Sequence, residues 1–359
     1  SSYTYTEKRK IMNNFNQRLL SARKMAGLSL QDLADRMDID ITKQALNQYE
    51  KGQTSPSSKV IISLSNALGL PVDYFFKKSD VKLENLEFRK KSSLSQKEIE
   101  AARFKTMDYL EKYLEIEGLL NVENTFTNPL KKAVIHNEQD IEKHANDLRK
   151  AWDLGLDPIP DVIALLEEKR IKVFELEAPD EFSGLSSRTD GIAVIVVNKN
   201  VNIVRKRFTA LHELAHLVLT FPDSMDDKQK ELLCYTFAGA FLFPEEVFKD
   251  EFGKKRTSIL LNELVLLENY YGISVQAIMR RAHGLQLISD SKFRDYQAWL
   301  SKSGNKKKEL GSFRGGETPM RFRRLVYKAL SEDIITYSKA AALFGVPQSE
   351  FEEELTRVI

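Results

Sequence analysis

Cysteine is almost absent from this sequence, and so are long apolar runs. Cys234 is the single cysteine among 359 residues, so no disulfide can form within the chain. That usage is typical of proteins from a reducing cytoplasm. No apolar run approaches the ~18–20 residues of a membrane-spanning helix. The first residues, SSYTYTEKRK, lack the apolar core of a signal peptide. We therefore expect a cytoplasmic protein with no membrane partner.

The charge is nearly balanced overall but unevenly distributed along the chain. The formal net charge is +2. Residues 1–91 contain 16 lysines and arginines against 10 aspartates and glutamates, whereas the rest contains 38 against 42. This asymmetry favours an anionic partner for the N-terminal part, with nucleic acid as the leading candidate. The alternative is a basic surface that only water contacts.

The pattern of apolar residues predicts the fold class and the order of domains. A chain of this length is expected to form two or three domains. Apolar residues recur at helical spacing in most segments, and IKVFELE and DGIAVIVVNKN read as strands. The sequence thus predicts a mainly α fold with a small β-sheet (α+β). We expect four segments: a helical bundle at 11–78, a linker and long helix at 79–125, a central domain at 126–290 and a C-terminal helical region at 291–359.

The segment RFTALHELAHLVL, residues 207–219, is the strongest indication of chemistry. Histidine is scarce, yet two of the five histidines, His212 and His216, lie in this segment. On a helix, residues four apart share a face and can hold one metal ion. Glu213 projects at a neighbouring angle, where it can take a proton from a water molecule and pass it to a leaving amine. The pattern predicts a zinc site with Glu213 as general base.

A catalytic zinc commonly has three protein ligands, so a third is expected nearby. Glu231 lies in the next predicted helix, which could return past the first and place its carboxylate at the ion. Asp223, Asp226 and Asp227 compete for this role from the intervening loop. Glu231 could instead be an exposed carboxylate near the start of a helix. The apolar strand GIAVIVVN could pair with a substrate peptide if it lies at the sheet edge, or it could be an ordinary core strand.

The segments RFTALHELAHLVL and ELLCYTFAGAFLFPEEVF, with the lead-in from LRKAWDLG to DGIAVIVVNKN, resemble the ImmA/IrrE metallopeptidases over roughly residues 140–290. The resemblance implies a zincin-like domain with zinc bound by His212, His216 and Glu231, and Glu213 as general base. It also implies cleavage of a protein partner, often a repressor, in response to a signal such as DNA damage. Two positions depart from the family: Tyr235 replaces a frequent Asn, and Ala215 a frequent Gly.

The N-terminal bundle contains a helix-turn-helix arrangement, since SLQDLADRM and TKQALNQYEKG are short helices separated by about four residues. Ser29 and Thr42 are expected N-caps, and Gly27 and Gly52 expected helix ends. Together with LSNALGLPVDYFF, these segments resemble the Xre/Cro-type repressors. The resemblance implies that Lys43, Gln44 and Gln48 face base edges in the major groove. It places a second group at the phosphates, namely Gln31, Thr42, Asn47, Lys51 and Gln53.

Repressors of this type generally bind operator DNA as homodimers, and the long helix at 99–120 is a candidate dimer contact, unless it packs within its own domain. Residues 303–319, SGNKKKELGSFRGGETP, are expected to form a mobile loop near the cleft or a linker, and 338–355 a packed helix pair. The sequence thus predicts a DNA-binding regulator fused to a zinc metalloendopeptidase that cleaves a protein partner. The alternative is a non-proteolytic repressor or antitoxin, whose zincin-like domain binds a toxin or senses a ligand.

Overall fold

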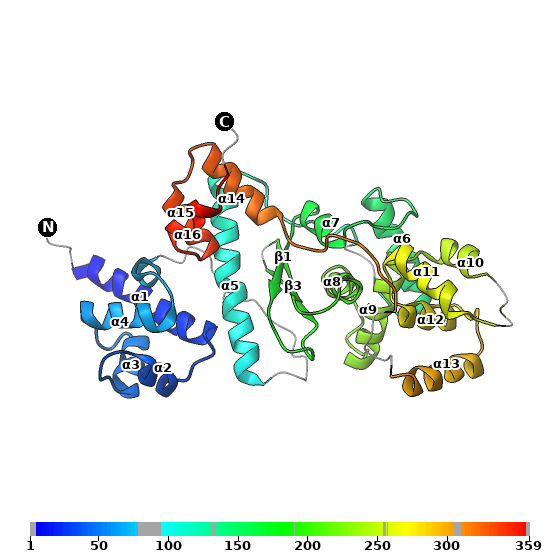
Figure 1. The fold of residues 1–359 in the computed structure, drawn as a ribbon, viewed down its shortest axis with the longest axis horizontal. Coiled ribbons are helices and arrows are strands. Elements are labelled where there is room, and N and C mark those ends of the chain that lie inside the picture. The colour runs from blue at the N-terminus through cyan, green and yellow to red at the C-terminus, as the bar shows by residue number, and fades with distance from the viewer. Residues whose placement is uncertain are drawn as a thin grey trace. The chain divides into compact units, whose positions relative to one another are not determined.

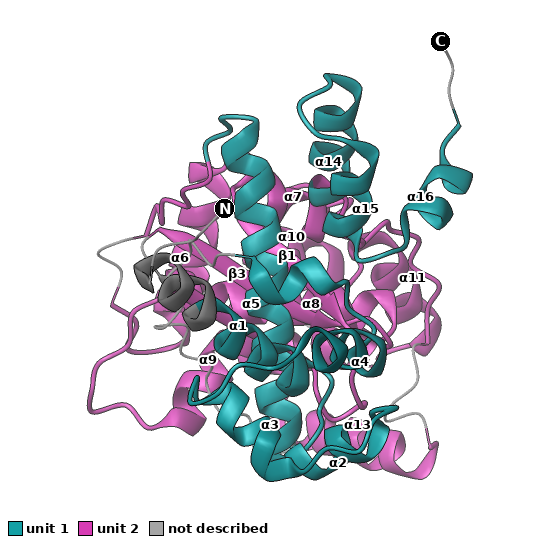
Figure 2. Ribbon diagram, turned by 90° about the vertical axis from the view of Figure 1, so that its left-hand side faces the viewer, with its two compact units in different colours: residues 1–85, 90–123, 322–359 teal, residues 86–89, 124–321 magenta. Residues whose placement is uncertain are grey.

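The chain folds into two compact units, shown in Figure 2. The computed structural model describes residues 5–77, 95–130, 134–189, 191–253, 256, 258–304 and 310–356, without the side chains of 5–13 and 189. Unit 1 comprises residues 1–85, 90–123 and 322–359, and unit 2 comprises 86–89 and 124–321. The predicted class, mainly helical with a small sheet, is confirmed. The predicted domain boundaries at 78, 125 and 290 differ from the limits of these two units. That the four predicted segments are separate domains stays a prediction.

Every described secondary-structure element of unit 1 is a helix (Figure 1). Most of the described helices lie in its N-terminal half, and three follow near the C-terminus. Their bounds are α1 Tyr5–Met25, α2 Leu30–Arg36, α3 Lys43–Glu50, α4 Ser58–Leu68, the 3₁₀ helix η1 Val72–Phe76, α5 Gln96–Leu119, α14 Arg321–Ser331, α15 Tyr337–Phe344 and α16 Gln348–Glu354.

The predicted caps of α2 and α3 are confirmed. The Ser29 and Asp32 side chains each accept a hydrogen bond from the other's backbone N–H, at 3.0 and 2.8 Å, which forms a capping box. Thr42 Oγ1 accepts from Ala45 N at 3.2 Å. Gly27 and Gly52 end their helical segments with φ angles of +64° and +66°. Local sequence therefore determines where these helices begin and end.

Unit 1 contains two apolar clusters. The first lies within α1–α4 and η1 and includes Phe15, Leu33, Leu46, Leu64 and Phe75. The second joins α5 to the three C-terminal helices, which Figure 1 shows beside it, and is listed here by its main members: Tyr113, Ile116, Phe322, Val326, Ala340, Leu343 and Phe351. The predicted packing of the pair within 338–355 is confirmed, since α15 contacts α16. The apolar face of α5 is therefore used inside unit 1.

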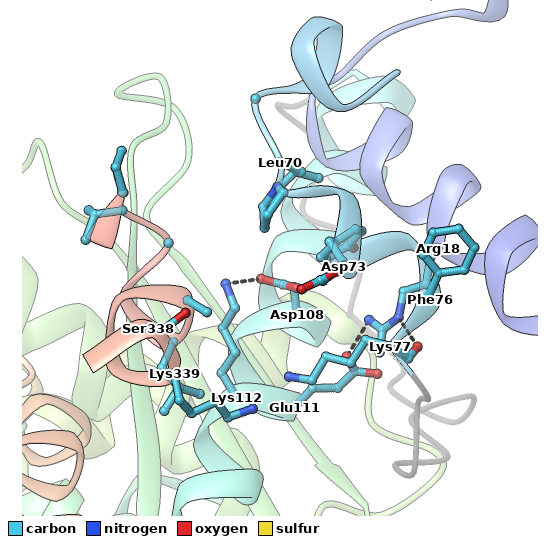
Figure 3. A pocket seen from close by; sticks show the side chains of 18 of the residues that line it. Arg18, Leu70, Asp73, Phe76, Lys77, Asp108, Glu111, Lys112, Ser338 and Lys339 are labelled. Carbon is cyan, nitrogen blue, oxygen red and sulfur yellow. Dashed lines mark hydrogen bonds and ion pairs between the residues drawn. The ribbon is translucent and has the colours of Figure 1, made fainter. Parts of the chain in front are cut away.

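Ion pairs join α5 to the N-terminal helices. Arg18 on α1 donates to Glu111 at 2.6 Å, and Lys77, which follows η1, donates to Glu115 at 2.6 Å. Lys339 on α15 contacts the other oxygen of Glu115. Figure 3 shows the Arg18 pair beside a cleft of about 730 Å³ between η1, α5 and α15. The residue after η1 and helix α15 thus share one carboxylate on α5.

Unit 2 combines a small sheet with the remaining helices (Figure 1). Its elements are α6 Glu138–Ala151, α7 Val162–Glu168, β1 Ile171–Leu176, β2 Gly184–Thr189, β3 Ile192–Asn198, α8 Ile203–Val218, α9 Asp227–Leu242, α10 Glu245–Phe252, α11 Leu261–Tyr271, α12 Val275–Gly284 and α13 Asp290–Lys302. Helix α8 packs on β2 and β3, and α9 lies between α8 and α6. Among the described residues, no helix in either unit is both long and apolar enough to cross a bilayer.

The three strands pair in the order β1-β3-β2. β1 runs parallel to β3, with Ile171 opposite Ala193, and β2 runs antiparallel, with Gly184 opposite Val197. The two predicted strands are confirmed as β1 and β3. The hypothesis that GIAVIVVN forms the sheet edge is wrong, because β3 is the central strand and nearly all of it is buried. The edge beside α8 is β2, whose sequence GLSSRT is too polar to have been recognised as a strand.

Residues 310–319, part of the segment 303–319 expected to be a mobile loop or a linker, are anchored by a buried carboxylate. Glu317 accepts hydrogen bonds from the N–H groups of Val162 and Ile163 at the start of α7, and pairs with Arg207 on α8 at 2.8 Å. Both members of the pair are fully buried. Burial raises the pKa of the Glu317 carboxyl even beside Arg207. The part of the predicted loop at 305–309 lies outside the described residues.

Candidate metal centre and nucleic-acid interface

Helices α8 and α9 bring the three predicted metal ligands together. His212 and His216 lie one turn apart on α8, and Glu231 lies in the first half of α9. The two Nε2 atoms are 3.2 Å apart, and each is 3.1 Å from an oxygen of Glu231. The histidine side chains are almost fully buried, whereas that of Glu231 is 37% exposed. The cluster is therefore reached from the Glu231 side.

The donor set fits a zinc ion. Two imidazole nitrogens and a carboxylate are ligands that zinc accepts, with bonds of ~2.0–2.1 Å. In a tetrahedral site such bonds place the ligand atoms roughly 3.3–3.4 Å apart, close to the distances found here. The hydrogen bonds from His212 and His216 hold the pKa of the Glu231 carboxyl well below its usual range, so it is ionised as a ligand must be. Asp223, Asp226 and Asp227 are not part of this group, and Asp226 instead caps α9.

One neighbour contacts a candidate ligand, and another contacts the predicted general base. Cys234 Sγ lies 3.5 Å from His216 Nδ1, on the side of the ring opposite the ligand nitrogen. Ser186 on β2 donates its hydroxyl to Glu213 Oε2 at 2.9 Å. Groups behind the first ligands commonly fix ring orientation and tune basicity. Ser186 thus connects the edge strand to the predicted general base.

Gly184 allows β2 to approach α8 closely. A Cβ atom at this position would lie 2.7 Å from a Thr209 methyl group, 2.8 Å from the Val196 carbonyl oxygen and 3.3 Å from the Glu213 side chain. Real Cβ atoms essentially never come this close to backbone, so glycine is required here. The short distance between Ser186 and Glu213 depends on that approach.

Helix α3 presents the predicted DNA-reading residues to solvent. Leu46 is its single buried residue and joins the apolar cluster of the bundle. The three predicted base-reading residues, Lys43, Gln44 and Gln48, are all exposed. Arg23 on α1 donates two hydrogen bonds to Glu50, at 2.6 and 2.8 Å, and so fixes the end of α3. A rigid helix with one polar exposed face suits insertion into a groove.

The five residues predicted to contact phosphates differ in their exposure. Asn47 is half-buried, whereas Gln31, Thr42, Lys51 and Gln53 are exposed. Two of these side chains already have local partners. Thr42 caps α3, and Gln31 donates to Asp35 at 2.7 Å along α2. Lys51 and Gln53 follow the end of α3, where the chain turns back at Gly52.

Comparison with known proteins finds a match for the region that contains α3 and another for the region that contains α8 and α9. The family model described as Helix-turn-helix matches residues 19–75, and the one described as IrrE N-terminal-like domain matches residues 166–283. The chain carries a helix-turn-helix domain and an IrrE N-terminal-like domain. The predicted resemblances are thereby confirmed. The helix-turn-helix match runs from the last third of α1 into η1, and the IrrE-like match runs from the end of α7 into α12.

Two curated proteins of Bacillus subtilis (strain 168) are similar to a short part of the chain. The uncharacterized HTH-type transcriptional regulator YqaE is 36% identical over 63 residues, which cover 18% of this chain and 53% of the relative. The SPbeta prophage-derived uncharacterized HTH-type transcriptional regulator YonR is 38% identical over 63 residues, covering 18% and 56%. The chain thus spans about half the length of the curated relatives it matches.

Within the IrrE-like domain, sequence reasoning missed Ser186 and gave Cys234 no role. Neither residue stands out in the sequence, because a serine in a polar segment and a cysteine in an apolar helix are both common. From the sequence, a downstream helix could bring His283 or Arg281 towards the metal cleft, although ordinary helix packing is favoured for both. In the structure Arg281 pairs with Glu142 at 2.6 Å and His283 contacts Asp290 at 2.8 Å. Neither is among the clustered ligands.

Proposed function

We propose that this protein is a DNA-binding transcriptional regulator whose IrrE-like domain is a zinc-dependent endopeptidase acting on a protein partner. The observation that carries the enzymatic part is the mutual contact of His212, His216 and Glu231, with Glu213 held beside them by Ser186. Zinc, when bound there, would polarise a scissile carbonyl and lower the pKa of a water molecule towards ~7.

The chain's own residues supply the remaining chemistry. The Glu213 carboxylate would take a proton from the attacking water and deliver it to the leaving amine. The hydrogen bond from Ser186 fixes the direction of that carboxylate. The β2 strand lies at the edge of the described sheet, next to Glu213, so a substrate peptide could pair with it in extended form.

The peptidase proposal is tested with Glu213→Gln. We expect the wild-type chain to bind about one zinc ion, measured by elemental analysis, and His212→Ala and Glu231→Ala to lose it. Glu213→Gln should keep its zinc and its DNA binding but lose cleavage by about 10²-fold or more. Substrates are identified from new protein N-termini in cells that express wild type but not Glu213→Gln. Identical N-termini and identical cellular function for both chains would make the domain a binding module, as in the antitoxin hypothesis.

For the helix-turn-helix domain, we propose that Lys43, Gln44 and Gln48 read base edges in an operator, while Gln31, Thr42, Asn47, Lys51 and Gln53 contact phosphates. One recognition helix provides little affinity, so we propose a homodimer on two half-sites. Selection of bound sequences from a random duplex library should return an inverted repeat, with half-sites about one helical turn apart. Recovery of single, unpaired half-sites would contradict the dimer, and recovery of no common sequence would contradict specific reading.

A further inference from the structure

A groove in unit 2 lies against the two helices that carry the candidate metal ligands. Its volume is about 800 Å³, and residues of α6, α8, α9, α10, α12 and α13 line it. Leu232, Tyr235 and Gly239 come from α9, and Phe208 comes from α8. These are the two helices that carry His212, His216 and Glu231, so the groove and the metal centre share their supporting elements.

Tyr235 connects the groove to the ligands. Its ring centroid lies 4.2 Å from that of His212 and 6.2 Å from that of Phe208, with which it is stacked. Tyr235 follows Glu231 by four residues on α9, and Phe208 precedes His212 by four on α8. Residues four apart share a helix face and lie about one turn, ~5.4 Å, apart. The aromatic pair therefore lies one helical turn from the ligand set on both helices.

The floor of this groove exposes large apolar side chains. Leu232 is 44% exposed and Tyr235 is 45% exposed. Gly239 is one turn beyond Tyr235 and adds no side chain, which leaves room above the helix. Adjacent exposed apolar side chains at a concave site are typical of binding surfaces. A ligand with an apolar group would bury them.

The charged side chains of the lining are balanced and so do not select an anion. Arg281 makes two hydrogen bonds to Glu142, at 2.6 and 2.8 Å. Lys143 and Arg280 are matched in number by Glu138 and Glu245. The amide side chains of Gln139 and Gln297 can both donate and accept hydrogen bonds, as a peptide backbone requires.

We infer that this groove is the specificity site of the peptidase. It binds a large aromatic or aliphatic side chain of an extended substrate segment. This side chain packs on Phe208, Leu232 and Tyr235 and belongs to a residue next to the bond that is cut. The inference rests on the proposed peptidase function and adds the class of residue that the substrate presents. It also gives a role to Tyr235, one of the two positions that depart from the ImmA/IrrE pattern.

The test uses two hydroxamic acids, which chelate zinc and differ only in what enters the groove. Acetohydroxamic acid has a methyl group, and 3-phenylpropionohydroxamic acid extends a phenyl ring. Their Kd values are measured by calorimetry on the zinc-loaded full chain. We expect the phenyl compound to bind wild type about 10-fold tighter or more, because its ring is buried on apolar side chains. In Leu232→Asn and Tyr235→Asn this preference should fall below about 3-fold.

Leu266→Asn is the matched control, because Leu266 is 69% exposed on α11 and does not line the groove. It should keep the full preference, and acetohydroxamic acid should bind Leu266→Asn and Leu232→Asn as tightly as wild type. Equal Kd values of the two compounds for wild type would overturn the groove inference and leave the metal centre intact. A chain that holds no zinc and binds neither compound would overturn the proposed function together with the inference. Zinc content of each variant distinguishes these outcomes.

Discussion

Helices α8 and α3 carry the two proposed functions in opposite ways. In α8, twelve of the sixteen residues are buried, among them His212, Glu213 and the charged Lys206 and Arg207. In α3, Leu46 is the single buried residue and the polar side chains face solvent. A metal centre needs a few polar groups fixed inside a core, whereas a reading helix needs a row of groups free to meet a partner. The difference predicts that substitutions around α8 alter folding and metal binding. Substitutions on the solvent-facing side of α3 should alter recognition alone.

The largest effect is expected from Glu317→Ala, which removes the ion-pair partner of the buried Arg207 on α8. Breaking a buried pair typically costs about 3–5 kcal/mol. We expect the free energy of unfolding, from urea titration, to fall by that amount, and zinc content to fall because Arg207 lies five residues before His212. Glu246→Ala, at an exposed glutamate on α10, is the control. A loss below about 1 kcal/mol would mean that 310–320 does not hold α8 in place.

A smaller effect, confined to recognition, is expected from Gln48→Ala on α3. Loss of a bidentate contact to a base should weaken binding to the selected operator by about 1–3 kcal/mol and relax the preference at one base pair. The unfolding free energy should change by less than about 0.5 kcal/mol, because Gln48 is exposed. Fluorescence anisotropy on operator duplexes measures the first quantity and urea titration the second.

Lys105→Ala on α5 is the control for that measurement, since it removes an exposed charge away from α3. Equal affinity of Gln48→Ala and wild type for every operator variant would remove Gln48 from the reading surface. A large loss of stability would instead show that the Gln48 side chain contributes to folding, although it is exposed.

The smallest effect is expected from Ser186→Ala, which tests how strongly the edge strand orients the general base. One hydrogen bond contributes about 1 kcal/mol, so cleavage of an identified substrate should slow by roughly 5-fold. Zinc content should not change, because Ser186 touches Glu213 and none of the three ligands. Ser301→Ala, at an exposed serine on α13, should cleave at the wild-type rate. An unchanged rate for Ser186→Ala would show that Glu213 is held by other contacts.

Local sequence determined much of this protein. Caps such as Ser29 and Thr42, and the four-residue spacing of His212 and His216, act over one or two helical turns, so their consequences can be read directly from neighbouring residues. Helical periodicity also indicated the fold class, and apolar β-branched runs indicated β1 and β3. The exposed face of α3 follows from the same periodicity.

Tertiary structure alone decided the rest, because the contacts join residues far apart in the chain. The clustering of Glu231, rather than one of the three aspartates, with His212 and His216 depends on how α9 returns past α8. The close approach of β2 to Glu213 depends on Gly184, where a Cβ atom would meet Thr209 and the Val196 carbonyl oxygen. Glu317 was hidden in a glycine-rich segment with no periodicity, and only burial against Arg207, 110 positions away, shows its role. Such contacts are set by the packing of whole elements, which no local pattern encodes.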